Sequence, residues 1–136
     1  MKKLLFLLGV VLVSCSQQSP TKTTNYHYSD VEDHIDWYDS FVQDSDEYLV
    51  YYYSETCAHC TLIKQEIIVY YFSEVEEMYF VNTNLNSKFG PTKDLKGICD
   101  INEFYIFGTP FLVKFKNHIV SDYYPGVSKI LDYLNR

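Results

Sequence analysis

Residues 48–60 read Tyr48-Leu49-Val50-Tyr51-Tyr52-Tyr53-Ser54-Glu55-Thr56-Cys57-Ala58-His59-Cys60, an apolar and aromatic run followed by a polar break and two closely spaced cysteines. A continuous run of this kind is typical of a strand that is covered on both faces. Beyond the break, apolar residues recur at helical spacing, namely Cys60, Ile63, Ile67, Tyr70 and Tyr71. The sequence therefore predicts a strand, a turn, and a helix that begins about Cys57.

Cys57 and Cys60 are separated by two residues at the predicted start of this helix. At that spacing the two sulfurs can close a small disulfide ring, and the unpaired N–H groups of the helix N-terminus favour the thiolate of Cys57. A protonated His59 would stabilise this thiolate further and make the disulfide more oxidising. The pattern predicts a redox-active dithiol. Two alternatives remain open: His59 is an ordinary exposed residue, or the cysteines are half of a zinc site, although a second CxxC pair is absent.

Further elements are predicted after the cysteine pair. Residues 78–82 form a second strand, parallel to the first because a helix connects the two. Residues 111–115 and 119–124 flank a tight turn and predict a β-hairpin. Residues 127–134 predict a short closing helix.

A helix is also predicted before the first strand. Ser29-Asp30-Val31-Glu32 has the form of a capping box, which marks a helix N-terminus. Behind it, apolar residues recur at helical spacing, and they are Val31, Ile35, Tyr38, Phe41 and Val42. One amphipathic helix is therefore expected to open the domain near Ser29.

Residues 29–136 resemble the thioredoxin superfamily. Besides the CxxC pair, residues 107–117 (FGTPFLVKFKN) are similar to the family segment in which a cis-proline precedes a strand and a hairpin turn, and Gly126 matches the glycine after the hairpin. The resemblance implies an α/β fold with a central mixed sheet flanked by helices. It also implies that Pro110 is cis and lies beside Cys57, where the Thr109 backbone would hold an extended substrate.

The chain departs from the family pattern at two places. Thr56 replaces the tryptophan of typical reductants, and Ala58-His59 replaces their Gly-Pro, which resembles disulfide isomerases and DsbA-type oxidants. Tyr51 occupies the position of a buried acid that assists proton removal from the second cysteine in many thioredoxins. Proton transfer from Cys60 must then take another route, and Glu55 on the predicted exposed turn is one candidate.

The first 28 residues are predicted to be an address and a tether. A short basic start and an apolar stretch over residues 4–13 are typical of an export signal, and Leu12-Val13-Ser14-Cys15 resembles the lipobox of bacterial lipoproteins. Residues 1–14 are thus expected to be a lipoprotein signal peptide, and residues 15–28 a flexible tether lipidated at Cys15. The alternative is an ordinary cleaved signal with an incidental cysteine.

Length and charge bound the rest. A chain of 136 residues with 47% hydrophobic residues fits one domain, and 18 acidic against 11 basic residues disfavour nucleic acid as a partner. Cys99 has no neighbouring cysteine and is expected to be a small buried apolar residue, although a regulatory third thiol remains possible.

These observations predict a membrane-anchored, extracytoplasmic thiol-disulfide oxidoreductase that works as a monomer without a bound metal or other cofactor. Its catalytic residues would be Cys57, Cys60 and His59, and its substrate-binding residues Thr109 and Pro110. Its partners would be exported proteins with thiols or disulfides, and a protein that recycles the dithiol. Two alternatives are a tethered Cu(I) or Zn chaperone that uses the same cysteines and His59, and an accessory lipoprotein whose fold serves only for docking.

Overall fold

The computed structural model describes residues 24–136. The predicted signal peptide, Cys15 and most of the predicted tether lie outside this range. The described elements, in chain order, are two 3-10 turns, η1 (Tyr28–Asp30) and η2 (Trp37–Asp39), then β1 (Glu47–Tyr53), α1 (Ala58–Phe72), β2 (Met78–Asn82), β3 (Phe111–Lys116), β4 (Ile119–Pro125) and α2 (Gly126–Leu134). Among residues 24–136, no helix is long and apolar enough to cross a bilayer.

The strands form one mixed sheet in the order β2-β1-β3-β4. β1 and β2 are parallel, with Leu49 opposite Met78, as expected for strands joined by a helix. β3 runs antiparallel to both β1 and β4, and the turn between β3 and β4 has positive φ at Asn117 and His118. The predicted strands, the hairpin and the closing helix are confirmed, and so is the mixed α/β architecture.

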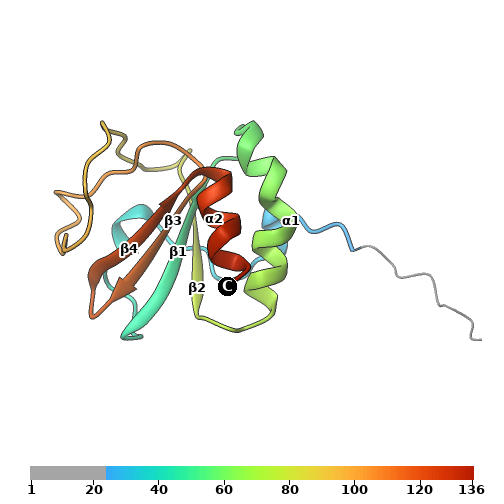
Figure 1. Ribbon diagram of the computed structural model, residues 1–136, viewed down its shortest axis with the longest axis horizontal. Coiled ribbons are helices and arrows are strands. Elements are labelled where there is room, and N and C mark those ends of the chain that lie inside the picture. The colour runs from blue at the N-terminus through green and yellow to red at the C-terminus, as the bar shows by residue number, and fades with distance from the viewer. Residues whose placement is uncertain (1–23) are drawn as a thin grey trace, which may run out of the picture.

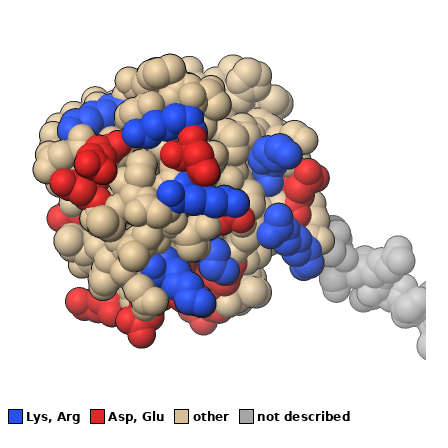
Figure 2. Space-filling view, turned by 60° about the vertical axis from the view of Figure 1, so that its left-hand side comes forward, with Lys and Arg blue, Asp and Glu red and all other residues tan. Residues whose placement is uncertain are grey.

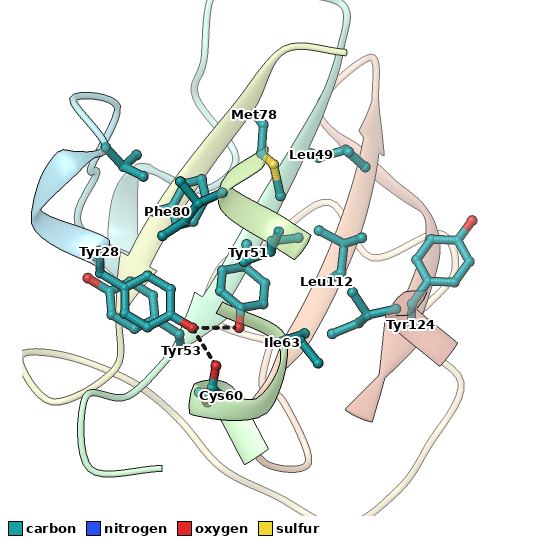
Figure 3. Close-up of a cluster of buried hydrophobic side chains, with 14 of the residues drawn as sticks. Tyr28, Leu49, Tyr51, Tyr53, Cys60, Ile63, Met78, Phe80, Leu112 and Tyr124 are labelled. Atoms are coloured by element: carbon teal, nitrogen blue, oxygen red, sulfur yellow. Dashed lines mark hydrogen bonds between the residues drawn. The ribbon is translucent and has the colours of Figure 1, made fainter. Parts of the chain in front are cut away.

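Both helices cover the same face of the sheet (Figure 1). Alternate residues of β1 point to this face, and there Leu49, Tyr51 and Tyr53 are buried in one cluster with Ile63 of α1 (Figure 3). Ile130 of α2 belongs to the same cluster. The cysteine pair begins the helix that packs on this cluster. The position of Cys57 and Cys60 is therefore set by the burial of the aromatic strand beneath them.

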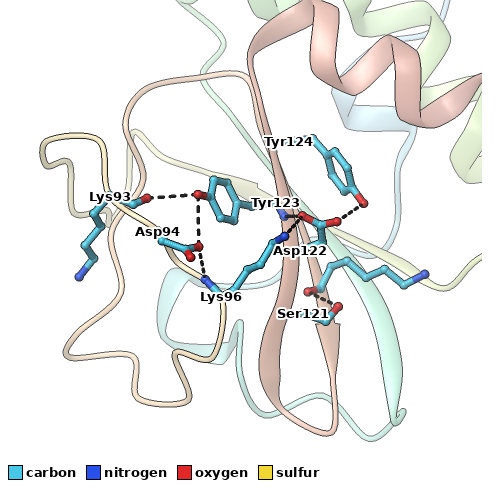
Figure 4. Close-up of polar contacts among 8 residues, drawn as sticks. Lys93, Asp94, Lys96, Ser121, Asp122, Tyr123 and Tyr124 are labelled. Atoms are coloured by element: carbon cyan, nitrogen blue, oxygen red, sulfur yellow. Dashed lines mark hydrogen bonds and ion pairs between the residues drawn. The ribbon is translucent and has the colours of Figure 1, made fainter.

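The opposite face is covered by irregular chain rather than by helices. Tyr48, Val50 and Tyr52 of β1 point to this face and pack with Trp37 and Phe104 in a second buried cluster. Much of the cover comes from the long connection between β2 and β3. This connection is held against β4 by polar contacts, including a Lys96–Asp122 ion pair and a hydrogen bond from the Tyr123 hydroxyl to the Lys93 backbone carbonyl (Figure 4).

The amphipathic helix predicted from Ser29 onward does not form. The segment instead contains η1 and η2, and Tyr38 and Val42 of the predicted apolar stripe are 55% and 65% exposed. Between the two turns the backbone pairs with β2, because Phe80 N–H donates to Asp33 O and Ile35 N–H donates to Phe80 O, both at 2.9 Å. Sheet pairing takes the place of helical hydrogen bonds here, and the prediction was wrong.

Packing against the domain begins before residue 29. Tyr28 is buried in the helix-side cluster, and Tyr26 is hydrogen-bonded to Gln65 of α1 through both its N–H and its carbonyl, each at 2.8 Å. The last residues of the segment predicted as a tether, residues 15–28, are therefore part of the packed structure.

Both edges of the sheet carry a short stretch of paired chain. On the β2 edge this is the bridge between His34 and Phe80. On the β4 edge, Gly97 N–H donates to Val120 O and Val120 N–H donates to Ile98 O, both at 2.9 Å. The unpaired N–H and C=O groups of an edge strand can pair with another chain. Each of these two segments occupies some of those groups on its edge.

Glu76, in the connection between α1 and β2, ties three elements together. Its carboxylate forms an ion pair with Lys114 of β3 at 3.0 Å and accepts hydrogen bonds from the hydroxyls of Tyr70 of α1 and Tyr133 of α2. Burial opposes ionisation of Glu76, but the hydrogen bonds and Lys114 outweigh it and lower the pKa of Glu76. The carboxylate therefore stabilises the folded state in its ionised form.

Replacing Glu76 with Gln should lower the free energy of unfolding at neutral pH by about 1.5 kcal/mol, because charge-assisted bonds are lost from a half-buried site. The lowered pKa gives this contribution its pH dependence. It is fully present above the unfolded-state pKa of about 4.3 and is lost as the pH falls through the lower pKa of the folded state. Urea unfolding of wild type and variant across this range should show the difference shrinking on acidification.

The matched control is Glu47→Gln, because Glu47 pairs with Lys116 where both side chains are more than half exposed. Such exposed pairs contribute little, so this variant should stay within about 0.5 kcal/mol of wild type. Equal losses in the two variants would contradict the role given to Glu76.

Candidate active site at Cys57 and Cys60

Cys57 is the N-cap residue of α1, directly after the turn that leaves β1. Its backbone is extended, and its N–H donates to the Ser54 carbonyl at 3.2 Å, which closes the turn. The Cys57 Sγ accepts a hydrogen bond from the backbone N–H of Cys60 at 3.1 Å. The sulfur thus occupies the place of an N-cap oxygen, where unpaired N–H groups stabilise negative charge.

The two thiols lie in unequal surroundings. Cys57 is half-buried, whereas Cys60 is fully buried. Burial opposes ionisation of Cys57, but side-chain hydrogen bonds with Cys60 and Thr109, together with the first N–H groups of the helix, outweigh it and lower the pKa of the Cys57 thiol. Burial, followed by the hydrogen bond with Cys57, raises the pKa of Cys60 to about 11. The geometry therefore gives one accessible sulfur that ionises readily and one buried sulfur that keeps its proton.

The loop before β3 lies against Cys57. The Thr109–Pro110 peptide bond is cis, as the resemblance implied, and the Cys57 thiol lies 3.4 Å from the Thr109 carbonyl oxygen. The Pro110 carbonyl accepts a hydrogen bond from the N–H of Gly126, which has φ of 81° and begins α2. This bond ties the loop to the second helix.

A shallow hollow of about 250 Å³ lies beside this loop. It is lined by Phe107, Gly108, Thr109, Pro110, Phe111, Pro125 and Gly126. None of these residues is charged, and most of their side chains are apolar or absent. The hollow beside the loop that contacts Cys57 therefore offers no charged side chain to a substrate.

The remaining predicted site residues are placed as follows. His59 is exposed on the first turn of α1, and it is its backbone N–H that lowers the pKa of Cys57. Glu55 lies on the exposed turn, as expected. Cys15 lies outside the described residues. The catalytic role of the His59 imidazole stays a prediction.

Cys99 is exposed, so the prediction of a buried apolar residue was wrong. Its neighbour Ile98 packs against the cluster under the sheet, and Gly97 and Ile98 pair with β4. Ile98 thus takes the inward position beside β4, and the next residue, Cys99, faces solvent.

Sequence reasoning missed two tyrosine hydroxyls under the cysteine pair. The Tyr28 hydroxyl donates to the Cys60 carbonyl at 2.8 Å and lies 3.1 Å from the Tyr51 hydroxyl (Figure 3). The position of Tyr51, six residues before Cys57, marked it as a residue near the pair, but not the bond that its hydroxyl makes. No sequence pattern marked Tyr28, because its approach to Cys60 depends on the path of a segment that was predicted to be a tether.

Among residues 24–136, no group of three or more His, Cys, Asp or Glu side chains is arranged to hold a metal ion. The cysteine pair therefore has no third ligand of these types within the described chain.

On the face shown in Figure 2, basic and acidic side chains lie interspersed.

The mixed four-stranded sheet, the two helices on one face, the CxxC pair at the start of the first helix and the cis-proline opposite it make up a thioredoxin-like fold. No protein-family model matches the sequence, and no curated protein matches it. Among solved structures, the chain is similar to thioredoxin f2 of Chlamydomonas reinhardtii, with a TM-score of 0.47 and 15% sequence identity. The match covers 75% of this chain and 92% of that one.

Proposed function

We propose that this protein is a thiol-disulfide oxidoreductase that acts through Cys57 and Cys60. The observation that carries the proposal is the asymmetry of the pair. The half-buried Cys57 sulfur accepts the Cys60 N–H at 3.1 Å and lies beside the Thr109 carbonyl, whereas Cys60 is buried with a raised pKa. An accessible thiolate next to a protected thiol is the arrangement that disulfide exchange requires.

In the reducing direction, the Cys57 thiolate attacks a substrate disulfide, forms a mixed disulfide with one substrate sulfur, and releases the other as a thiolate that takes up a proton. Cys60 then loses its proton and attacks the Cys57 sulfur, so that the second substrate thiolate leaves. The substrate gains two electrons, and the protein ends with a Cys57–Cys60 disulfide.

In the oxidising direction, a substrate thiolate attacks the Cys57 sulfur of the Cys57–Cys60 disulfide, and Cys60 leaves and is protonated. A second substrate thiolate attacks the substrate sulfur of the mixed disulfide and releases the Cys57 thiolate. Stabilising that thiolate favours this direction, because it makes Cys57 a better leaving group. No bound cofactor takes part in either direction.

The substrate would lie extended along Thr109 and Pro110, with one side chain over the hollow formed by residues 107–111, Pro125 and Gly126. Backbone pairing at one loop gives broad rather than sequence-specific recognition. This fits substrates that are exported proteins still forming their disulfides.

The lipidated Cys15 would hold the domain on the extracytoplasmic side of a bacterial membrane, where disulfides persist. A second protein of that compartment would recycle the dithiol. Labelling of cells with a radioactive fatty acid, compared between wild type and Cys15→Ala, tests the anchor. Label in the wild type alone supports it, and equal labelling of both contradicts it.

The decisive measurement for the proposed activity is the reduction potential of the Cys57/Cys60 couple in glutathione buffers. A potential near about −120 mV would define an oxidant, and one near about −270 mV a reductant. Absence of any exchange between the pair and glutathione would overturn the proposal.

Replacing Cys60 with Ser should trap substrates as mixed disulfides on Cys57, because the attack that releases them is lost while the accessible thiolate remains. Adducts should accumulate in cells to at least about ten times the wild-type level. They should be visible on non-reducing gels and disappear on reduction.

The control for this prediction is the double variant Cys57→Ser, Cys60→Ser, which has lost both thiols of the pair and should trap nothing. Equal trapping by the double variant would assign the adducts to the exposed Cys99 instead. The absence of adducts from the single variant would count against exchange through Cys57.

A further inference from the structure

Two buried tyrosine hydroxyls form a hydrogen-bonded chain that ends on the first turn of α1. The Cys60 carbonyl can only accept, so Tyr28, at 2.8 Å from it, must give that bond its single hydroxyl hydrogen. The Tyr51 hydroxyl, 3.1 Å from that of Tyr28, must then be the donor in the second bond. The chain therefore runs from Tyr51 through Tyr28 to Cys60, in one direction only.

The three linked residues come from three separate elements. Tyr51 lies on β1, Tyr28 on η1 and Cys60 on α1 (Figure 3). A second attachment lies about one turn further along the helix, where Gln65 bonds the backbone of Tyr26. The first two turns of α1 are thus fixed both to the sheet and to the segment before it.

Fixing the Cys60 carbonyl has a direct consequence for the neighbouring thiol. Cys60 holds its carbonyl against Tyr28 and points its own N–H at Cys57 Sγ, 3.1 Å away. Both groups belong to the first turn of α1, so a shift of this turn away from Tyr28 would also move the N–H away from the sulfur. The hydroxyl chain therefore supports the hydrogen bond that stabilises the Cys57 thiolate.

The two phenols act as donors and not as bases. Burial raises the pKa of Tyr51 well above its ordinary value, and burial likewise raises the pKa of Tyr28. Both hydroxyls stay protonated and neutral throughout the range in which Cys57 ionises. Unlike a buried carboxylate, they add no negative charge that would oppose the thiolate.

We infer that Tyr28, supported by Tyr51, is a positioning residue for the redox pair: it holds Cys60 so that its N–H faces Cys57 Sγ, and it thereby stabilises the dithiol form relative to the disulfide. This inference rests on the proposed function, because it concerns the same couple. It also makes the segment that precedes the domain's first strand part of the redox site.

The test is the Cys57/Cys60 equilibrium with glutathione in Tyr28→Phe, a change that removes only the hydroxyl. Losing the support of one hydrogen bond should favour the disulfide by about fivefold, which is about 20 mV toward more negative potential. The thiolate absorbance of Cys57 should titrate at higher pH in the variant. Tyr51→Phe should shift both quantities in the same direction by about twofold, because Tyr28 keeps its bond to Cys60 but loses its donor.

Tyr53→Phe is the matched control. Tyr53 lies on the same strand and stacks on Tyr28 with ring centroids 3.9 Å apart, but its hydroxyl bonds His34 Nε2 at 2.8 Å, away from the cysteines. It should leave the equilibrium within about 1.5-fold of wild type, although its loss of a half-buried hydrogen bond should lower the melting temperature.

An unchanged equilibrium in Tyr28→Phe, or an equal shift in Tyr53→Phe, would overturn the inference. If Tyr28→Phe does not fold, Tyr51→Phe decides by the same criteria. A wild-type protein that fails to exchange with glutathione would instead overturn the proposed function, so the two failures are distinguishable.

Discussion

A Cys57→Ser variant is expected to lose disulfide exchange altogether, with the rate of insulin reduction falling at least about 1,000-fold, to that of buffer. The Cys57 sulfur is the half-buried member of the pair. Burial opposes its ionisation, but hydrogen bonds with Cys60, Thr109 and the helix N-terminus outweigh burial and lower its pKa. A serine hydroxyl at the same position stays protonated at these pH values and cannot form a disulfide. Turbidity of reduced insulin, followed with a catalytic amount of protein, gives the rate.

Cys99→Ser is the control for this experiment. Cys99 is an exposed free thiol far along the chain from the pair. The variant should retain the wild-type rate within about twofold. If Cys57→Ser kept activity within about tenfold of wild type and lost it only when Cys99 was also replaced, Cys99 and not Cys57 would carry the exchange. That result would contradict the prediction.

A Phe104→Ala variant is expected to lose about 4 kcal/mol of unfolding free energy, the usual cost of emptying a large aromatic site in a packed core. Phe104 is fully buried, although it lies in the irregular connection between β2 and β3. Its ring packs against Trp37 and Phe41, with centroids 5.3 Å away in each case, and against Tyr52 of β1 at 5.8 Å. Removing it detaches the connection from the face opposite the helices.

Urea unfolding followed by circular dichroism measures this loss. Phe89→Ala, on the same connection but 56% exposed, should change stability by less than about 1 kcal/mol. The alkylation rate of Cys57 in folded Phe104→Ala should match wild type, since the sheet separates the two sites. A loss below about 1.5 kcal/mol would show that the connection contributes little to the core.

The parts of the fold that sequence predicted well are those set by local pattern. A pattern of only a few residues was enough to predict the aromatic run of β1, the second strand and the hairpin around Asn117. The start of α1 at the CxxC pair was predicted within one residue, because a polar break and helical spacing meet there. The cis bond before Pro110 followed from a resemblance rather than from spacing.

The parts that sequence did not predict depend on contacts between distant segments. Apolar residues from Val31 to Val42 have helical spacing, yet the backbone between them is recruited by β2, about 45 residues further along the chain. Cys99 faces solvent because Ile98 takes the inward place beside β4. The approach of Tyr28 to Cys60 likewise depends on tertiary packing, so no local pattern could reveal it.

The paired edges of the sheet bear on the resistance of this domain to aggregation with unfolded polypeptides. An open strand margin is a template onto which sticky, incompletely folded polypeptides can add, and that is how aggregates grow. Here residues 33–35 pair with the centre of β2 on one edge, and residues 97–98 pair with the beginning of β4 on the other. Under the proposed function, an unfolded substrate binds at the loop before β3 and is released again. The covered edges keep the protein itself from adding to aggregates of such substrates.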